Sequence, residues 1–109
     1  MDDYHYPKKG TEKLAKLYEL KPDLMQAFRD FDGKVFAGGT LSTLVKELIA
    51  VAVAHTTQCP FCIASHTRRA KKVGASDAEL AEAIFVAVAL RAGGALAHGS
   101  VAMAALEDK

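Results

Sequence analysis

Cysteine is scarce in this sequence, which has only Cys59 and Cys62 among its 109 residues. Two cysteines are too few for the multi-disulfide framework that stabilises many small secreted domains. Because only two residues separate them, they instead suggest thiol redox chemistry or part of a metal site.

The chain also has little net charge, since 14 Lys and Arg residues face 13 Asp and Glu residues for a formal charge of +1. This balance argues against a protein held to nucleic acid or to a membrane surface by bulk charge. With 8 glycines, 3 prolines and half of its residues hydrophobic, the chain does not fit disordered or collagen-like classes. At this length we expect residues 1–109 to form a single domain.

Long apolar runs are missing as well, the longest being residues 48–54 and 83–90. A membrane span takes about 20 such residues. The first residues of the chain are polar and do not resemble a signal peptide. We therefore expect a cytoplasmic protein that does not cross a membrane.

The apolar residues recur at helical spacing, and no alternating segment lies between hairpin turns. Ser42 or Thr40 is suited to cap the third helix, and Ser76 with Glu79 forms a capping box for the fifth. We expect an all-α bundle of five to six helices. The expected helices cover residues 11–20, 22–32, 43–57, 60–73, 77–92 (ended by Gly93 and Gly94) and 95–106.

Three segments are apolar on nearly every side, namely residues 48–54, 83–90 and 101–106. Such helices must be buried all round, but a chain this short can surround few of them. The 20 alanines also allow helices to approach closely. We therefore expect a homo-oligomer whose subunits complete one another's cores.

Pro60 marks the start of the fourth helix, because proline suits the first helical position and pushes the residue before it out of the α region. Cys59 is then the N-cap and Cys62 lies in the first turn. There, free N–H groups and the positive end of the helix dipole stabilise a thiolate, and we expect both sulfurs to benefit. The spacing also brings the two Cα atoms within the roughly 4.4 to 6.8 Å that a disulfide needs.

His66 follows Cys62 by four residues, so it lies one turn further along the same face and can exchange a proton with the thiol. Glu47 lies on the preceding helix. At a rise of about 1.5 Å per residue, a helical hairpin brings Glu47 level with His66 to within about one turn. Glu47 would then orient His66 or share its proton, and if buried it needs a polar partner.

Two alternatives to a redox enzyme remain open on these residues. The first is a zinc-stabilised module with His55, Cys59, Cys62 and His66 as ligands, although the break at Pro60 and the spacing do not match a usual zinc finger. The second is a redox-responsive oligomer in which oxidation of the cysteines alters assembly without turnover.

A run of basic residues ends the fourth helix before Gly74, where cations suit the helix dipole. We interpret this run as a solvated helix end rather than an anion or nucleic-acid site, because no aromatic residues are interleaved with it. Its members are Arg68, Arg69, Lys71 and Lys72.

The spacing E-x11-C-x2-C-x3-H, formed by Glu47, Cys59, Cys62 and His66, resembles the alkylhydroperoxidase D-like branch of the carboxymuconolactone decarboxylase family. The resemblance extends over residues 41–92, including the segments LIAVAVA and HTRRAKKVGASDAELAEA. It implies an all-α fold, assembly into trimers or hexamers, and thiol peroxidase (peroxiredoxin-type) or disulfide reductase activity without a metal, flavin or other cofactor.

The resemblance also implies roles for individual residues. Cys62 would be the peroxidatic thiol, Cys59 the resolving and exchange thiol, and His66 with Glu47 a proton relay. His55 would belong to the relay or to the wall of the site. An external dithiol, carried by a lipoyl or thioredoxin-like protein or by a small thiol, would reduce the pair.

The chain departs from the family pattern in two respects. Phe61 stands between the cysteines where the better-known peroxidase has a histidine, and the chain lacks the duplicated helical half. The lactone decarboxylase that gives the family its name lacks the CxxC pair, so decarboxylation is the less favoured activity here.

Overall fold

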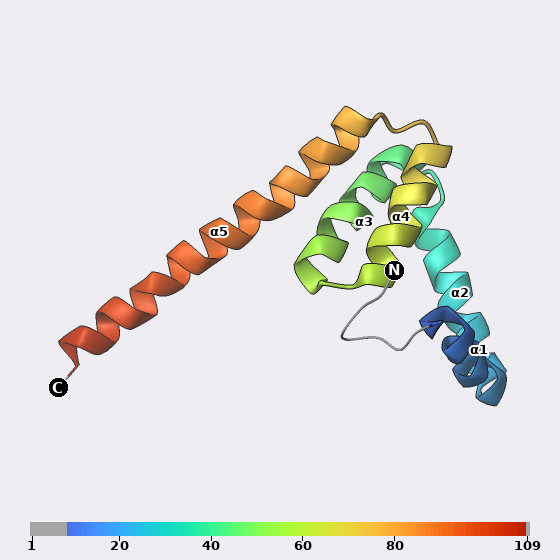
Figure 1. Ribbon diagram of the computed structural model, residues 1–109, viewed down its shortest axis with the longest axis horizontal. Coiled ribbons are helices and arrows are strands. Elements are labelled where there is room, and N and C mark those ends of the chain that lie inside the picture. Colours follow the sequence, from blue (N-terminus) through green and yellow to red (C-terminus); the bar gives the residue numbers. More distant parts are fainter. Residues whose placement is uncertain (1–8, 109) are drawn as a thin grey trace. The chain divides into compact units, whose positions relative to one another are not determined.

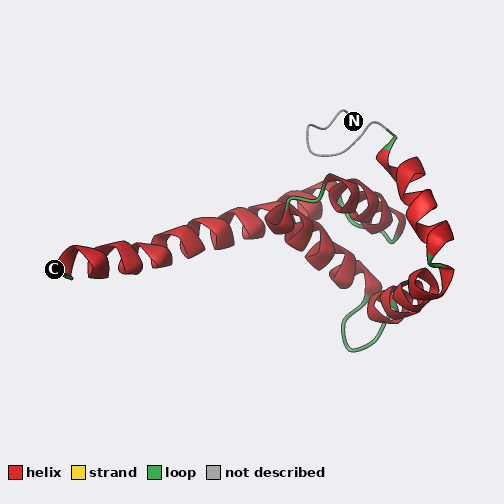
Figure 2. Cartoon of the chain, turned by 90° about the horizontal axis from the view of Figure 1, so that it is seen from below, coloured by secondary structure: helices red, strands yellow, loops and turns green. Residues whose placement is uncertain are grey.

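A computed structural model describes residues 9–108, and within that range the chain is helical without a strand (Figure 1). Figure 2 shows the helices joined by short loops. The all-α prediction is therefore confirmed, while the polar N-terminal segment, residues 1–8, lies outside the described residues. The helices are α1 (Gly10–Leu20), α2 (Pro22–Phe36), α3 (Thr43–Thr57), α4 (Pro60–Lys72) and α5 (Asp77–Glu107).

Internal contacts divide the chain into two compact units, residues 1–40 and residues 41–109. In the first unit α1 contacts α2. In the second unit α3 contacts both α4 and α5, so it is the central helix of that unit (Figure 1). All of the predicted site residues lie in the second unit.

The first unit is a helical hairpin with Pro22 at the start of its second helix. The Arg29 guanidinium lies 5.7 Å from the centre of the Tyr18 ring, a cation–π contact between the two helices. The second helix continues through Gly33 to Phe36, beyond the predicted end, because one glycine costs a helix only about 1 kcal/mol.

The start and end of α3 follow from local signals. Ser42, rather than Thr40, caps the helix, and its hydroxyl accepts a hydrogen bond of 3.2 Å from the Val45 amide. At the other end Gln58 takes the left-handed conformation with φ of 58°, and the amides of Gln58 and Cys59 both donate to the Ala54 carbonyl. This turn ends the helix and leaves two residues before Pro60 begins α4.

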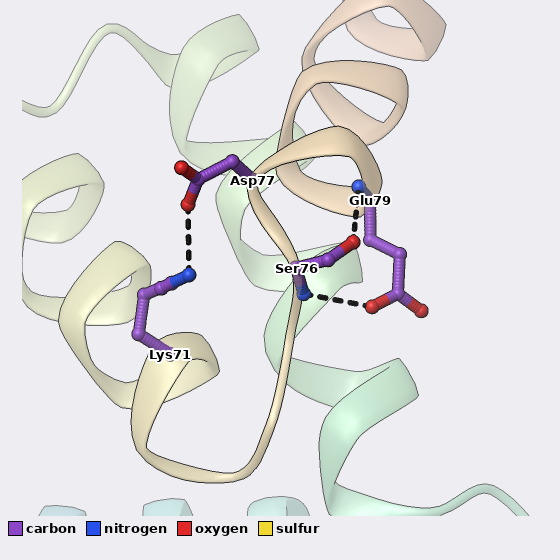
Figure 3. Close-up of polar contacts among 4 residues, drawn as sticks. All are labelled: Lys71, Ser76, Asp77 and Glu79. Atoms are coloured by element: carbon purple, nitrogen blue, oxygen red, sulfur yellow. Dashed lines mark hydrogen bonds and ion pairs between the residues drawn. The ribbon is translucent and has the colours of Figure 1, made fainter.

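The connection from α4 to α5 is fixed by charged and capping side chains (Figure 3). Ser76 and Glu79 form the predicted capping box: the Ser76 hydroxyl accepts a hydrogen bond of 3.0 Å from the Glu79 amide, and Glu79 Oε1 accepts one of 2.8 Å from the Ser76 amide. Lys71 Nζ lies 2.7 Å from Asp77 Oδ1, and this ion pair lowers the pKa of the Asp77 carboxyl. The turn therefore has a defined geometry at both helix ends.

The prediction that Gly93 and Gly94 separate two helices is wrong, because α5 runs without a break from Asp77 to Glu107. A Cβ added at either glycine meets nothing within 4 Å, so packing within the described chain does not demand glycine there. The cost of about 1 kcal/mol per glycine is small for a helix of 31 residues that is rich in alanine.

Because α5 is continuous, it forms a longer apolar segment than any single run in the sequence predicts. By length and composition alone, this helix is long and apolar enough to cross a membrane. Each apolar run in the sequence is too short for a membrane span, but α5 joins residues 83–90 and 101–106 in one continuous helix.

The apolar core of the second unit is small. Its buried members are Val51, Ala70, Ala75 and Leu80, with Leu44, Leu48 and Ile84 packed against them. Most of α5 lies outside this core, and its exposed large side chains include Phe85, Leu90, Leu96, Val101 and Leu106. From residue 91 onward every described residue except Gly99 is exposed.

Candidate active site

Glu47 and His66 meet across the α3–α4 hairpin. The Glu47 side chain is only 2% exposed, and its Oε1 lies 2.6 Å from His66 Nδ1. This confirms the prediction that a helical hairpin brings the two residues level. Because an ionised carboxylate can only accept, His66 donates its Nδ1 proton, and its Nε2 is then the nitrogen that can gain or lose a proton.

Arg69 is a third member of this group that the sequence interpretation missed. Its Nε lies 3.0 Å from Glu47 Oε2, so the interpretation of the basic run as a solvated helix end is wrong for this residue. The signal was present in the spacing, since His66 and Arg69 are three residues apart and share one face of α4. The buried carboxylate of Glu47 thus has a partner at each oxygen.

Burial makes these partners necessary for Glu47. A buried carboxylate that lacks hydrogen bonds or a cation carries a large desolvation cost. In the described part of the chain, no buried side-chain nitrogen or oxygen is left without a hydrogen-bond partner. The α3–α4 hairpin therefore holds one buried charge and supplies its full set of partners.

The two cysteines occupy the predicted places at the start of α4. Cys59 is the N-cap, Pro60 is the first helical residue, and Cys59 Sγ accepts a hydrogen bond of 3.3 Å from the Cys62 amide. Both side chains are half-buried, and the two sulfurs are not joined in a disulfide. This is the first turn of the helix that carries His66 one turn further on.

The acidity of Cys62 differs from the prediction that both thiols are stabilised as thiolates. The pKa of Cys62 is raised to about 11, first by burial and then by the hydrogen bond and the charge of Cys59, and the Cys62 amide offsets part of this rise. A negative charge on Cys59 opposes a second one on Cys62. Cys62 is therefore protonated at neutral pH and needs a base before it can act as a nucleophile.

His55 lies on the side of α3 that faces α5. Its Nδ1 donates to the Val51 carbonyl at 2.7 Å, and its ring lines a groove of about 280 Å³ together with Ile84 and Arg91. Arg91 donates to the Thr56 carbonyl at 2.9 Å and so satisfies one free carbonyl at the end of α3.

A metal centre does not form from these residues as they lie. Within residues 9–108 no three His, Cys, Asp or Glu side chains are grouped so that they could hold a metal ion. The zinc alternative required His55, Cys59, Cys62 and His66 at one point, and His66 Nδ1 is instead engaged by Glu47.

Several solved structures resemble this fold. A carboxymuconolactone decarboxylase family protein from Legionella pneumophila superimposes with a TM-score of 0.72 at 36% identity, over 95% of this chain and 93% of that one. A protein from Methanobacterium thermoautotrophicum gives a TM-score of 0.74 at 34% identity, over 78% of this chain and 96% of that one.

Sequence relatives extend over nearly the whole chain. A Paracoccus denitrificans protein named "Uncharacterized protein 4 in cox locus" is 42% identical over 108 residues, which are 99% of this chain and 96% of that protein. An uncharacterized protein from Cupriavidus necator is 33% identical over 94 residues, 86% of this chain and 83% of that protein. The sequence profile of the carboxymuconolactone decarboxylase family matches residues 22–108. The chain therefore belongs to the carboxymuconolactone decarboxylase family.

Proposed function

We propose that the protein is a thiol peroxidase of the alkylhydroperoxidase D-like type, which reduces hydroperoxides through a dithiol–disulfide cycle of Cys59 and Cys62. One observation carries the proposal. The CxxC pair forms the first turn of α4, and the buried Glu47–His66 pair lies one turn further along the same helix. A nucleophile, a second thiol and a positioned base are thus held on one hairpin.

In the first step His66 Nε2 takes the proton of the Cys62 thiol, while Glu47 keeps the ring oriented through Nδ1. The Cys62 sulfur then attacks one oxygen of the hydroperoxide. A sulfur–oxygen bond forms, the oxygen–oxygen bond breaks, and the leaving oxygen takes the proton back from His66. The products are an alcohol, or water from hydrogen peroxide, and a sulfenic acid on Cys62.

In the second step the Cys59 thiolate attacks the sulfenic sulfur of Cys62. The disulfide forms, and the hydroxyl group leaves as water after it gains a proton. An external dithiol then exchanges with the disulfide, is itself oxidised, and returns both cysteines to the reduced state. A lipoyl or thioredoxin-like protein has the required chemistry.

We further propose that the protein works as a cytoplasmic homo-oligomer, a trimer or a hexamer. The support is the apolar surface of the second unit, where large side chains such as Leu96 and Leu106 are 81% and 76% exposed. Copies of the chain would cover this surface. Leu96 and Leu106 lie on α5, which also carries Arg91 in the middle of its apolar stretch. Arg91 donates a hydrogen bond to the Thr56 carbonyl of α3.

Steady-state peroxide consumption with dihydrolipoamide as the dithiol tests the enzymatic proposal. We expect the wild type to turn over, Cys62→Ser to lose activity completely, and Cys59→Ser to stop after one equivalent with a sulfenic acid that dimedone traps. Ser65→Ala, on the same helix, serves as the matched control and keeps the wild-type rate. Equal peroxide consumption by all four proteins would contradict the proposal.

A further inference from the structure

The carboxylate of Glu47 is shared between a histidine and an arginine of α4. Arg69 Nε lies 3.0 Å from Oε2, and His66 Nδ1 lies 2.6 Å from Oε1. The Glu47 side chain is 2% exposed, whereas that of Arg69 is 40% exposed, so the arginine reaches from the surface to a buried charge. Nothing in the proposed cycle of the two cysteines uses Arg69.

The charges of Glu47 and Arg69 determine which protonation state of His66 is favoured. Without Arg69, the buried negative charge of Glu47 would favour a positively charged imidazole as its counter-ion. With Arg69 in place, the carboxylate already has a permanent cation, because a guanidinium does not lose its proton in proteins. A neutral His66 then suffices to complete the hydrogen bonds of Glu47.

We propose that Arg69 is a positioning residue that keeps Glu47 ionised and directed at His66, so that His66 stays neutral and its Nε2 can accept the Cys62 proton near neutral pH. Arg69 does not touch the thiols in this assignment and acts through Glu47. The part of the inference that concerns catalysis rests on the proposed function, whereas the part that concerns the protonation of His66 does not.

Other charged and titratable groups lie on α4 and on the helices packed against it. On α4 the thiols of Cys59 and Cys62 lie at the start of the helix, and Lys71 is paired with Asp77 of α5. On the far side of α3, Arg91 of α5 is bonded to the Thr56 carbonyl. Among these groups Arg69 alone shares the Glu47 carboxylate with His66, so its removal should act on that ring first.

Nuclear magnetic resonance of ¹³C-labelled histidine in the reduced full-length protein tests the assignment, with the His66 signal identified by its loss in His66→Gln. In Arg69→Gln we expect the ring to titrate at higher pH by about one unit, because one positive charge has gone from its surroundings. In Arg69→Lys the positive charge is kept, and we expect the His66 ring to titrate close to the wild-type pH. Arg68→Gln, which removes an exposed arginine from the neighbouring position, leaves the titration unchanged.

Unchanged titration of His66 in Arg69→Gln, or an equal shift in Arg68→Gln, would overturn the assignment. A second measurement needs no variant and remains decisive if Arg69→Gln does not fold. In the wild type, the Arg69 Nε–H resonance should move with the same midpoint as the His66 ring, because both bond to Glu47. An Nε–H signal that does not respond to the titration of His66 would also overturn it.

The pH profile of peroxide reduction separates positioning from a structural effect. In Arg69→Gln the acidic limb should move to higher pH by about one unit, with a plateau within about twofold of wild type, and Arg69→Lys should reverse the shift. A loss of rate that is equal at every pH would show a structural role and overturn the assignment. If the wild type shows no peroxidase activity, the proposed function fails, and the two resonance measurements still decide the role of Arg69.

Discussion

Glu47 is the residue around which the candidate site is organised, since a buried carboxylate requires partners and those partners fix the geometry. His66 and Arg69 meet its two oxygens at 2.6 and 3.0 Å. The same carboxylate therefore fixes the ring of His66 and anchors α4 against α3. Its position about one turn inside α3 makes the hairpin, rather than a loop, the support of the site.

The acidity of Cys62 gives a prediction at this scale. Because the hydrogen bond and charge of Cys59 both raise the pKa of Cys62, Cys59→Ser should lower it from about 11. Burial, the largest cause, remains, so the pKa should stay above the ordinary value of a thiol. The pH dependence of iodoacetamide alkylation measures this pKa. A pKa in Cys59→Ser that stays at about 11 or rises would contradict the account.

At the scale of elements, the sequence was sufficient to predict features that depend on short-range contacts, above all the starts of helices. Pro60 and the Ser76–Glu79 capping box correctly predicted where two helices begin, and for a third helix the structure selects Ser42 from the two predicted caps, Ser42 and Thr40. The rise of a helix per residue was enough to place Glu47 level with His66. These features depend on contacts within a few residues or on regular helix geometry.

The features that the sequence did not predict depend on burial and on contacts between helices. Arg69 was assigned to a solvated helix end because the dipole argument does not show that a buried carboxylate lies opposite it. The acidity of Cys62 reflects burial and the charge of its neighbour, which outweigh the helix start. The unbroken α5 shows that two glycines cost less than the rest of the helix contributes.

The capping box predicts a measurable stability at the start of α5. Ser76→Ala removes the acceptor for the Glu79 amide and should lower the free energy of unfolding by about 1 kcal/mol. Urea denaturation at one fixed protein concentration measures the loss. Ser100→Ala is the matched control, since that hydroxyl only donates to the Ala97 carbonyl within the same helix. Equal stabilities of the two variants would contradict the role of the box.

At the scale of the whole molecule, the apolar surface exceeds what the chain covers by itself. Among residues 9–108 only six apolar residues are buried, four of them in the core described above, whereas exposed large side chains occur along α2, α3 and α5. Extended apolar surface of this kind is typical of interfaces between subunits. The homo-oligomer proposed above gives these side chains a partner surface.

Light scattering after size-exclusion chromatography tests this proposal. We expect a mass that is three or six times the 11.6 kDa of one chain, unchanged by dilution in the micromolar range. Leu96→Glu and Val101→Glu together should lower the mass, because charges cannot be buried between apolar helices without partners. A wild-type mass equal to one chain would contradict the proposal.

The central claim is that Cys59 and Cys62 form one redox-active pair served by the Glu47–His66 hairpin. Its most direct test is a single turnover, in which reduced protein receives one equivalent of an organic hydroperoxide and is analysed by mass spectrometry over time. The account predicts that the peroxide is consumed and that a disulfide between Cys59 and Cys62 forms at the same rate, more slowly in His66→Gln. Two free thiols together with unconsumed peroxide would contradict it.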